Sequence, residues 1–185
     1  LTPLAPLHNP ANVLGIRLAR EWFPRATHVA VFDTAFHSTL ALYASRYAIP
    51  KRLATEHGVR RYGFHGSSHA WASQRAAELL GRPLEELRLV ILHLGAGASA
   101  TAVLGGKSID TSMGMTPMEG LVMATRSGDI DPGVPLFLQR ELGMTAAEVD
   151  CLLNRESGLR GYCEEPDLRE VLRRADEGDA DAHLA

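Results

Sequence analysis

The most regular hydrophobic pattern of the chain lies near its middle. Residues 88–94 form a mostly apolar run, RLVILHL, that is too short and too β-branched for a helix and is typical of a strand buried on both faces. After a glycine turn at 95–97, residues 99–104 have the composition of a second strand. Gly105-Gly106 predicts a two-residue hairpin turn before a third strand at 107–110. The pattern therefore predicts a β-meander.

The first turn of this meander has the sequence Gly-Ala-Gly and is a candidate anion site. Residues without a Cβ atom let the backbone approach a ligand closely, and the amides of such a turn can hold an anion. A dinucleotide-binding loop or a Walker loop would lead into a helix instead of a strand. A serine-hydrolase elbow, Gly-x-Ser-x-Gly, is not matched, because Thr101 stands at its last position. A tight turn without a ligand remains the alternative.

Apolar periodicity and capping residues predict helices on both sides of the meander. The first begins at Asn9-Pro10, buries Leu14, Leu18 and Trp22 on one face, and ends at Pro24. Further helices are predicted at 36–47, 69–80, 118–123 and 134–142, then from the capping box Thr145-x-x-Glu148 to near Gly158, and from Pro166 onward. Together with a buried strand at 27–32, these elements favour an α/β fold.

Asp33 directly follows the predicted strand at 27–32. In open α/β sheets, ligands bind in the crevice beyond the carboxyl ends of the strands. A carboxylate at this position is therefore a candidate functional group. A turn or a helix cap is the alternative role.

The segment 62–69, YGFHGSSH, combines two histidines with two glycines. Ser68 is a plausible N-cap for the helix at 69–80, and the N-terminus of a helix attracts anions. His65 and His69 have the spacing of a zinc-binding pair, but Gly66 stands where the glutamate of His-Glu-x-x-His would be. We interpret His65 as a polar contact in a cleft, opened by its glycine neighbours.

A polar loop at 124–133 carries one arginine, Arg126, among small residues. The planar guanidinium can bind phosphate oxygens through two parallel hydrogen bonds. An ion pair with Asp129 or Asp131 is the alternative, and composition alone does not separate the two.

Composition narrows the class of protein. The chain has 185 residues, 45% hydrophobic and 22% charged, which fits an ordinary globular protein. A net charge of −3 gives no electrostatic reason to expect a nucleic acid or an anionic membrane as partner. Cys151 and Cys163 have neither metal-binding nor redox spacing. The sequence shows no membrane span and no signal peptide and lacks an initiating Met, so we expect a cytoplasmic protein present here as a fragment.

Four loops together resemble the acetate kinase family, which includes acetate, propionate and butyrate kinases. They are residues 32–37 (FDTAFH), 62–69 (YGFHGSSH), 93–99 (HLGAGAS) and 124–132 (ATRSGDIDP), in the order and with the spacings of the family. The resemblance implies two ribonuclease-H-like domains of the actin-like ATPase type, with a mixed sheet and the active site between the domains. It assigns residues 1–35 to the end of the first domain and 36–185 to part of the second, nucleotide-binding domain.

The same resemblance implies a reaction and its participants. ATP and a short carboxylate such as acetate would give ADP and an acyl phosphate, reversibly and with Mg²⁺, in a homodimeric full-length protein. We expect Asp33 to orient Mg²⁺ or a bound water. The resemblance assigns catalytic roles to Asp33, His65 and Arg126. It assigns nucleotide contacts to His93, Leu94, Gly95, Ala96, Gly97, Asp167, Leu168 and Arg169, a substrate pocket to Leu7, Phe64 and Pro117, and further cleft positions to His8 and His69.

The chain departs from the family in two respects. Ala96 stands where the family usually has asparagine, which removes one side-chain contact to the phosphates. The family's chains are also much longer, so we expect the 185-residue piece alone to have little or no kinase activity. A propionate or butyrate kinase, and a non-catalytic actin-like nucleotide-binding module, are the alternatives.

Overall fold

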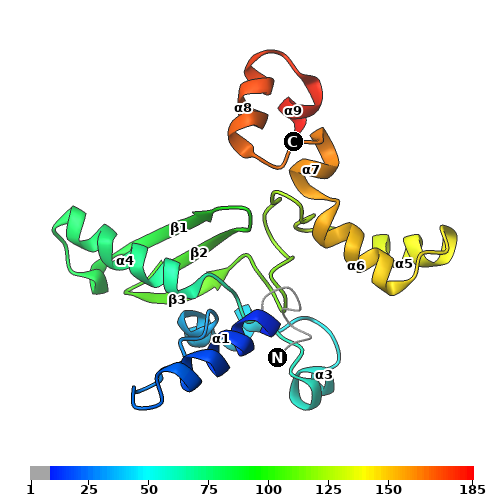
Figure 1. Ribbon diagram of the computed structural model, residues 1–185. Helices are drawn as coiled ribbons and strands as arrows, with labels where there is room; N and C mark the ends of the chain where they lie inside the picture. Colours follow the sequence, from blue (N-terminus) through cyan, green and yellow to red (C-terminus); the bar gives the residue numbers. More distant parts are fainter. Residues whose placement is uncertain (1–8) are drawn as a thin grey trace.

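A three-stranded antiparallel sheet, in the order β1-β2-β3, lies at the centre of the computed structural model, which describes residues 9–185 (Figure 1). The strands are β1 (Arg88–Leu94), β2 (Ala98–Leu104) and β3 (Lys107–Thr111). The helices are α1 (Asn9–Trp22), η2 (Ala35–Thr39), α2 (Leu42–Ser45), α3 (Lys51–His57), α4 (Gly66–Leu80), η3 (Leu84–Glu86), α5 (Gly133–Glu141), α6 (Ala146–Arg155), α7 (Gly158–Cys163), α8 (Leu168–Asp176) and α9 (Ala180–Leu184). The predicted meander and the α/β class of fold are confirmed.

The two turns of the meander fix the register of its strands. Gly105 and Gly106 have φ angles of +55° and +77°, the left-handed values that a type I′ hairpin requires. The turn at residues 95–97 joins β1 to β2, and the pairing that follows places His93 opposite Ser99. Their side chains therefore project from the same face of the sheet.

Helix α4 packs against β1 and covers that face. Its buried side chains, His69, Ser73 and Ala77, recur every four residues. On the other face of β1, Val90 is 76% exposed and Leu92 is 56% exposed. The prediction that this strand is buried on both faces is wrong, because its side chains alternate between two faces and α4 covers one of them.

The predicted strand at 27–32 does not form. Val29 and Val31 are 78% and 76% exposed, and within residues 9–185 no strand pairs with this segment. A strand depends on hydrogen bonds from a neighbouring strand, so an apolar run without a neighbour stays irregular. The sheet of the described residues is accordingly antiparallel throughout and lacks the parallel strand of a mixed sheet.

The helix predicted at 36–47 is divided into η2 and α2. The buried ring of His37 lies with Nδ1 2.9 Å from Ser108 Oγ on β3, and the Thr39 hydroxyl donates to the Ser108 carbonyl at 2.7 Å. These contacts hold η2 against the sheet, and the chain changes direction before α2. Long-range contacts thus override the local helical pattern here.

The helix predicted at 118–123 is also absent, because these residues belong to a loop. Gly120 has φ of +107°, outside the helical region. Its amide donates to Asp129 Oδ1 at 2.8 Å, and the Asp129 amide donates to the Gly120 carbonyl at 2.9 Å. This reciprocal pair closes the loop that carries Arg126.

The capping box at the start of α6 is confirmed. The Glu148 amide donates to Thr145 Oγ1 at 3.2 Å, and the Thr145 amide donates to Glu148 Oε2 at 2.7 Å. The helix ends at Arg155, however, and a separate helix, α7, begins at Gly158, near the predicted end. Gly158 has φ of +64°, and a Cβ at this position would lie 2.1 Å from the Met123 carbonyl oxygen. The chain at Gly158 therefore packs closely against the loop that contains Met123, and this contact separates α6 from α7.

Helices α7, α8 and α9 surround a small hydrophobic core of their own, formed by Leu159, Cys163, Val171 and Ala182. Figure 1 shows α8 and α9 set apart from the sheet. The helix predicted from Pro166 corresponds to α8, whereas α9 was not predicted. Both cysteines are free thiols, as expected. No helix of residues 9–185 is both long and apolar enough to cross a membrane.

Candidate active site

Three histidines meet beside Ser99, on the face of the sheet that α4 covers. The Ser99 Oγ atom lies 2.8 Å from His65 Nδ1 and 2.8 Å from His69 Nε2. The His93 ring stacks on the His65 ring, with centroids 3.9 Å apart and planes 23° apart. His93 Nδ1 in turn lies 2.9 Å from Ser68 Oγ. The His65 ring is therefore held both at its edge and on its face.

Asp33 binds the first turn of α4. Its Oδ2 accepts a hydrogen bond from the His65 amide at 2.8 Å, and its carbonyl oxygen accepts one from the Gly66 amide at 2.8 Å. The prediction of Ser68 as N-cap is wrong, because α4 begins at Gly66 and the Ser68 hydroxyl contacts His93. Asp33 thus occupies the amides of His65 and Gly66 at the N-terminus of this helix, and its negative charge suits the positive end of the helix.

The backbone at this junction is unusual. His65 has φ of +58°, a left-handed value that is uncommon for a residue with a Cβ atom. A Cβ at Gly66 would lie 2.4 Å from the Asp33 carbonyl oxygen, so only glycine permits this approach. Strained conformations of this kind persist where the surrounding structure fixes them, and they concentrate at functional sites.

The guanidinium of Arg126 is half-buried and forms no ion pair with any described residue. Its Nη1 donates to the Pro117 carbonyl at 3.0 Å. Asp129 and Asp131, the alternative partners, instead accept hydrogen bonds from backbone amides at 2.8 Å and 2.7 Å. Burial lowers the pKa of Arg126, which reflects the cost of a charge removed from water. Apart from a 3.9 Å contact of Nη1 with Met123 Sδ, Arg126 has no other hydrogen-bond partner within the described part of the chain, so its remaining N–H groups can bind an anion.

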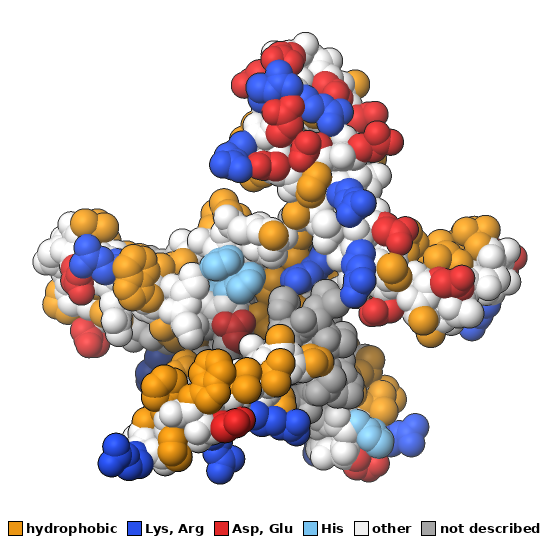
Figure 2. Space-filling view, viewed as in Figure 1, with side chains coloured by type: hydrophobic (Ala, Val, Ile, Leu, Met, Phe, Trp, Pro, Cys, Tyr) orange, Lys and Arg blue, Asp and Glu red, His pale blue; other side chains and the backbone are white. Residues whose placement is uncertain are grey.

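Arg126 and His65 both line the space beside Gly97. A Cβ at Gly97 would lie 3.2 Å from Arg126 Nη1 and 3.6 Å from His65 Nε2. Within the turn, the Gly95 amide donates to the Gly97 carbonyl at 3.1 Å, whereas the amides of Ala96 and Gly97 make no hydrogen bond to any described residue. The turn therefore offers two amides, those of Ala96 and Gly97, next to an imidazole and a guanidinium. Figure 2 shows histidine side chains near the centre of this face, with acidic and basic side chains close by.

Burial keeps His65 and His69 neutral. The pKa of His65 is lowered to about 4, mainly by burial and also by the nearby His93 and Arg126, while Asp33 opposes the change. Burial also lowers the pKa of His69 to about 4, with contributions from His37 and the other histidines. At neutral pH each of the two rings therefore carries one proton and no charge.

Two of the three predicted pocket residues lie beside this space. Phe64 packs against a core cluster of Ala98, Met113 and Met123, and the Pro117 carbonyl accepts the hydrogen bond from Arg126. The third, Leu7, lies outside the described residues, as does His8.

The predicted nucleotide contacts at Asp167, Leu168 and Arg169 lie at the start of α8, away from the histidines (Figure 1). Asp167 and Arg169 form a bidentate pair, with Nε–Oδ1 at 3.0 Å and Nη2–Oδ2 at 2.5 Å, and this pair lowers the pKa of Asp167 to about 2. Leu168 is 46% exposed. These three residues are therefore not brought into contact with the rest of the site.

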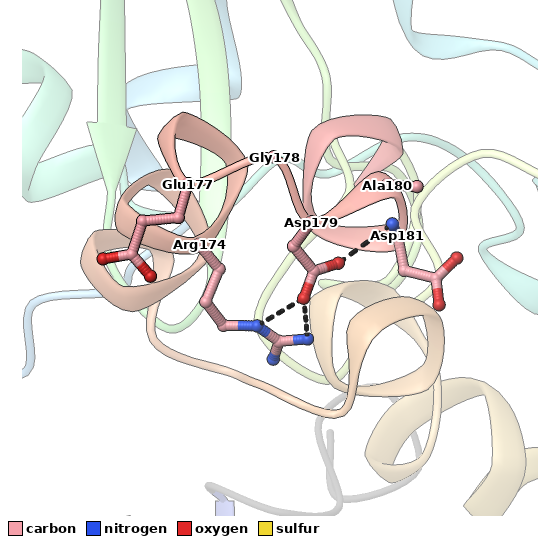
Figure 3. A pocket seen from close by; sticks show the side chains of 6 residues that line it. All are labelled: Arg174, Glu177, Gly178, Asp179, Ala180 and Asp181. Atoms are coloured by element: carbon pink, nitrogen blue, oxygen red, sulfur yellow. Dashed lines mark hydrogen bonds and ion pairs between the residues drawn. The ribbon is translucent and has the colours of Figure 1, made fainter.

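A shallow hollow at the junction of α8 and α9 contains no predicted site residue (Figure 3). Arg174 in this hollow is neutralised by Asp179, whose Oδ2 lies 2.9 Å from Nε and 2.6 Å from Nη2. Among the described residues, the hollow consequently has no unpaired cation of the kind found at Arg126.

The residues present fit a magnesium ion held largely by water and substrate. Asp33 is exposed and, among the described residues, uses only Oδ2 of its carboxylate in a hydrogen bond. Mg²⁺ is usually bound by one or two carboxylates together with waters and substrate phosphates, so a single carboxylate suffices here. Across residues 9–185, no three His, Cys, Asp or Glu side chains are placed to enclose a metal ion by themselves.

Ser99 and Ser68 were not predicted as site residues. The signal for Ser99 is present in the sequence, because a three-residue turn at 95–97 places it opposite His93. Its contact with two histidines of another element could not be predicted from the linear pattern, since it depends on how α4 packs on the sheet.

A guanidinium without a counter-ion among residues 9–185, a neutral imidazole and a glycine turn lie around one space, and together they form a donor set of the kind used by a phosphotransferase. The chain belongs to the acetate kinase family, because the model of the Acetokinase family matches it over residues 1–185. It is 64% identical over 185 residues to an acetate kinase of Leifsonia xyli, covering 100% of this chain and 47% of that protein. The chain therefore spans about half the length of the curated relatives that it matches.

Solved structures agree with this membership. A propionate kinase from Francisella tularensis is 49% identical, with a TM-score of 0.94 over 99% of this chain and 47% of its own. An acetate kinase from Porphyromonas gingivalis is 47% identical, with a TM-score of 0.91 over 99% of this chain and 46% of its own. The α/β arrangement described above is thus the arrangement of this family.

Proposed function

We propose that these 185 residues are the central part of a cytoplasmic acetate kinase, which transfers a phosphoryl group reversibly between ATP and acetate. The products of the forward reaction are acetyl phosphate and ADP, and Mg²⁺ accompanies the nucleotide. The observation that carries the proposal is the half-buried guanidinium of Arg126, which has no acidic partner among the described residues and faces His65 across Gly97. Names of the relatives, in which acetate kinase recurs, support the choice of substrate.

The chemistry requires positioned donors more than covalent catalysis. The phosphoryl group in transfer spreads negative charge over three equatorial oxygens. In our proposal Arg126 and His65 Nε2 stabilise these oxygens, and the amides of Ala96 and Gly97 hold the neighbouring phosphate. Carboxylic acids titrate near pH ~4, so acetate is already ionised at neutral pH and needs no general base.

The remaining residues orient the substrates. Asp33 orients Mg²⁺ or one of its waters, and the ion would neutralise charge on the phosphates. Phe64 and Pro117, with Leu7, line the pocket for the methyl group of acetate. His93 and Leu94 belong to the phosphate turn together with Gly95. Asp167, Leu168 and Arg169 contact the nucleotide at a distance from the reacting group.

We also propose the division of the full-length protein. Residues 1–35 end the first domain and cross to the second, residues 36–185 form part of the second, and the full-length protein is a homodimer. The chain spans about half of its relatives, which supports the expectation that it is nearly inactive alone.

The direct test is acyl phosphate formation, trapped with hydroxylamine, by the 185-residue chain and by the full-length protein. We expect product from ATP and acetate with the full-length protein only. Product formed at equal rates by the 185-residue chain would contradict the assignment of an incomplete site. ATP binding without product from any short carboxylate would instead select a non-catalytic module, the alternative that Ala96 favours.

A propionate kinase is the second candidate, supported by the similarity to the propionate kinase of Francisella tularensis. An additional methylene in a pocket changes specificity by only about 1–3 kcal/mol, so sequence similarity does not separate the two. The same assay with acetate, propionate and butyrate decides between them through kcat/KM for each acid.

A further inference from the structure

Ser99 can donate only one hydrogen bond, although it lies within hydrogen-bonding distance of two imidazole nitrogens. Its Oγ is 2.8 Å from His65 Nδ1 and 2.8 Å from His69 Nε2, and the residue is fully buried. The hydroxyl oxygen could accept from both rings, but its own proton would then be buried without an acceptor, because Ser99 Oγ has no other hydrogen-bond partner among the described residues. With both rings neutral, Ser99 therefore donates to one ring and accepts from the other. Two arrangements of protons are possible.

In the first arrangement, His69 Nε2–H donates to Ser99 and the Ser99 hydroxyl donates to His65 Nδ1. The proton of His65 is then on Nε2. In the second arrangement all directions are reversed, and the proton of His69 is on its Nδ1.

The surroundings of His69 Nδ1 favour the first arrangement over the second. This atom is buried away from solvent and has no hydrogen-bond partner among the described residues. In the second arrangement it would be a buried N–H donor without an acceptor, which is the rarest kind of unsatisfied polar group. In the first arrangement it is only a lone pair without a donor. The first arrangement also requires that His65 Nε2, which carries the proton, accepts no hydrogen bond. Within the described structure, Arg126 donates no hydrogen bond to His65, so this requirement is met on that side.

We infer that Ser99 and His69 are positioning residues that fix His65 as the Nε2–H tautomer, with its proton directed toward the space beside Gly97 and Arg126. This inference rests on the proposed function, since it assigns His65 the role of a neutral hydrogen-bond donor to the transferred phosphoryl group. His65 then neither gains nor loses a proton during turnover.

The surroundings of the ring support a fixed orientation. His65 stacks on His93 at a centroid distance of 3.9 Å, and His93 is itself held by Ser68 at 2.9 Å. A flipped His65 ring would lose the contact with Ser99. The donor is therefore preorganised, which avoids reorganisation at the moment of reaction.

The test uses ¹⁵N NMR of the full-length protein labelled on its histidine imidazoles, because protonated and unprotonated ring nitrogens resonate far apart. His65→Asn identifies the His65 signals, and asparagine tolerates the left-handed backbone at this position. We expect the His65 proton on Nε2 in the unmodified protein. In Ser99→Ala we expect a mixture of tautomers, together with a fall in kcat of roughly 10- to 100-fold and little change in KM for ATP.

Ser108→Ala is the matched control. Ser108 is also a fully buried strand serine, and its hydroxyl lies 2.9 Å from Nδ1 of another histidine, His37. We expect its removal to leave the His65 signals and kcat unchanged. Ser99→Thr, which keeps the hydroxyl, should restore the Nε2–H tautomer and most of kcat.

Several outcomes would overturn the inference. They are a His65 proton on Nδ1 in the unmodified protein, an unchanged tautomer in Ser99→Ala, an altered tautomer with full kcat, or equal effects of Ser99→Ala and Ser108→Ala. Failure of the proposed function gives a different result. In that case the protein forms no acyl phosphate at all, while the tautomer of His65 is still measured by NMR.

Discussion

The main-chain amide of His65 donates a hydrogen bond to the carboxylate of Asp33 at 2.8 Å, while His65 itself adopts a left-handed backbone conformation. One carboxylate therefore both holds the amide of the N-cap residue of α4 and acts electrostatically on the imidazole of the same residue. These two roles can be separated by mutation.

Asp33→Asn keeps an acceptor oxygen but removes the negative charge, whereas Asp33→Ala removes both. We expect Asp33→Asn to lower kcat by roughly 100-fold, a typical effect of removing one electrostatic contact at a reacting centre, with little change in thermal stability. Asp33→Ala should in addition cost about 0.5–2 kcal/mol, the usual cost of losing a helix cap. Kinetics and denaturant unfolding of both variants measure this. Full activity in Asp33→Asn would show that the charge plays no part.

Gly97→Ala fills the space between the two proposed donors. Its Cβ would lie 3.2 Å from Arg126 Nη1 and 3.6 Å from His65 Nε2. We expect KM for acetyl phosphate to rise and kcat to fall, each by roughly 10-fold or more, because donors displaced by ~1 Å lose much of their effect. Gly15→Ala, on α1 with open space around it, is the control and should leave both constants unchanged. Equal kinetics of the two variants would mean that no anion binds beside Gly97.

The buried histidines make stability depend on pH. Burial lowers the pKa of His65 and His69 from 6.5 to about 4, and it also lowers the pKa of His37. Between pH 6.5 and pH 4 the unfolded chain binds protons at these positions and the folded chain does not. The free energy of unfolding therefore falls as the pH decreases through this range, and these groups have no effect above it.

Melting temperatures measured from pH 7.5 to pH 4.5 check this dependence. We expect the decrease to be smaller in His69→Asn, which removes one of the lowered groups. His183→Asn, at an exposed position on α9, should retain the full decrease. An identical decrease in His69→Asn would show that the buried histidines do not cause it.

Glu119 links the loop before Arg126 to Arg61 and Tyr47. Arg61 Nη2 pairs with Glu119 Oε1, and its Nη1 donates to the Thr111 carbonyl at 2.8 Å. The Tyr47 hydroxyl donates to Glu119 Oε2, and burial together with this carboxylate raises the pKa of Tyr47 to about 12. We expect Glu119→Gln to lower the free energy of unfolding by about 1–3 kcal/mol. This range lies between the typical costs of breaking an exposed and a buried ion pair.

Glu78→Gln is the control for this prediction. Glu78 pairs with Arg75 on the exposed surface of α4, where such a pair is worth about 0–1 kcal/mol. Denaturant unfolding of both variants measures the difference. An equal effect of the two changes would mean that the Glu119 cluster does not hold the loop.

The sequence predicted those elements whose signals are local. The β-meander was predicted from an apolar run, a second segment of strand-like composition and two glycine turns, and the capping box at Thr145 is satisfied by residues three apart. The strand expected at 27–32 failed because its formation depends on a neighbouring strand, which no short pattern contains. The end of α6 before Gly158 was missed for a similar reason, since the Met123 carbonyl that approaches it comes from a distant loop.

The candidate site was predictable as a set of residue types but not as a geometry. The structure brings Asp33, His65, His93, Arg126 and the turn at 95–97 together, although they come from separate segments. Within residues 9–185, the alternative of an ion-paired Arg126 and the prediction of Ser68 as N-cap could be rejected only once the partners of each group were known. Asp167 and Arg169 lie on α8, and their role toward a nucleotide remains a prediction.

The most direct test of the account is the rate of acyl phosphate formation by Arg126→Ala in the full-length protein, compared with Arg160→Ala. Arg160 is an exposed arginine whose backbone amide contacts the same loop, at the Ala124 carbonyl. We predict that Arg126→Ala lowers kcat by roughly 100- to 1,000-fold with a much smaller effect on ATP binding, and that Arg160→Ala retains the full rate. A kcat of Arg126→Ala within a few fold of the unmodified enzyme would contradict the claim that this guanidinium stabilises the transferred phosphoryl group.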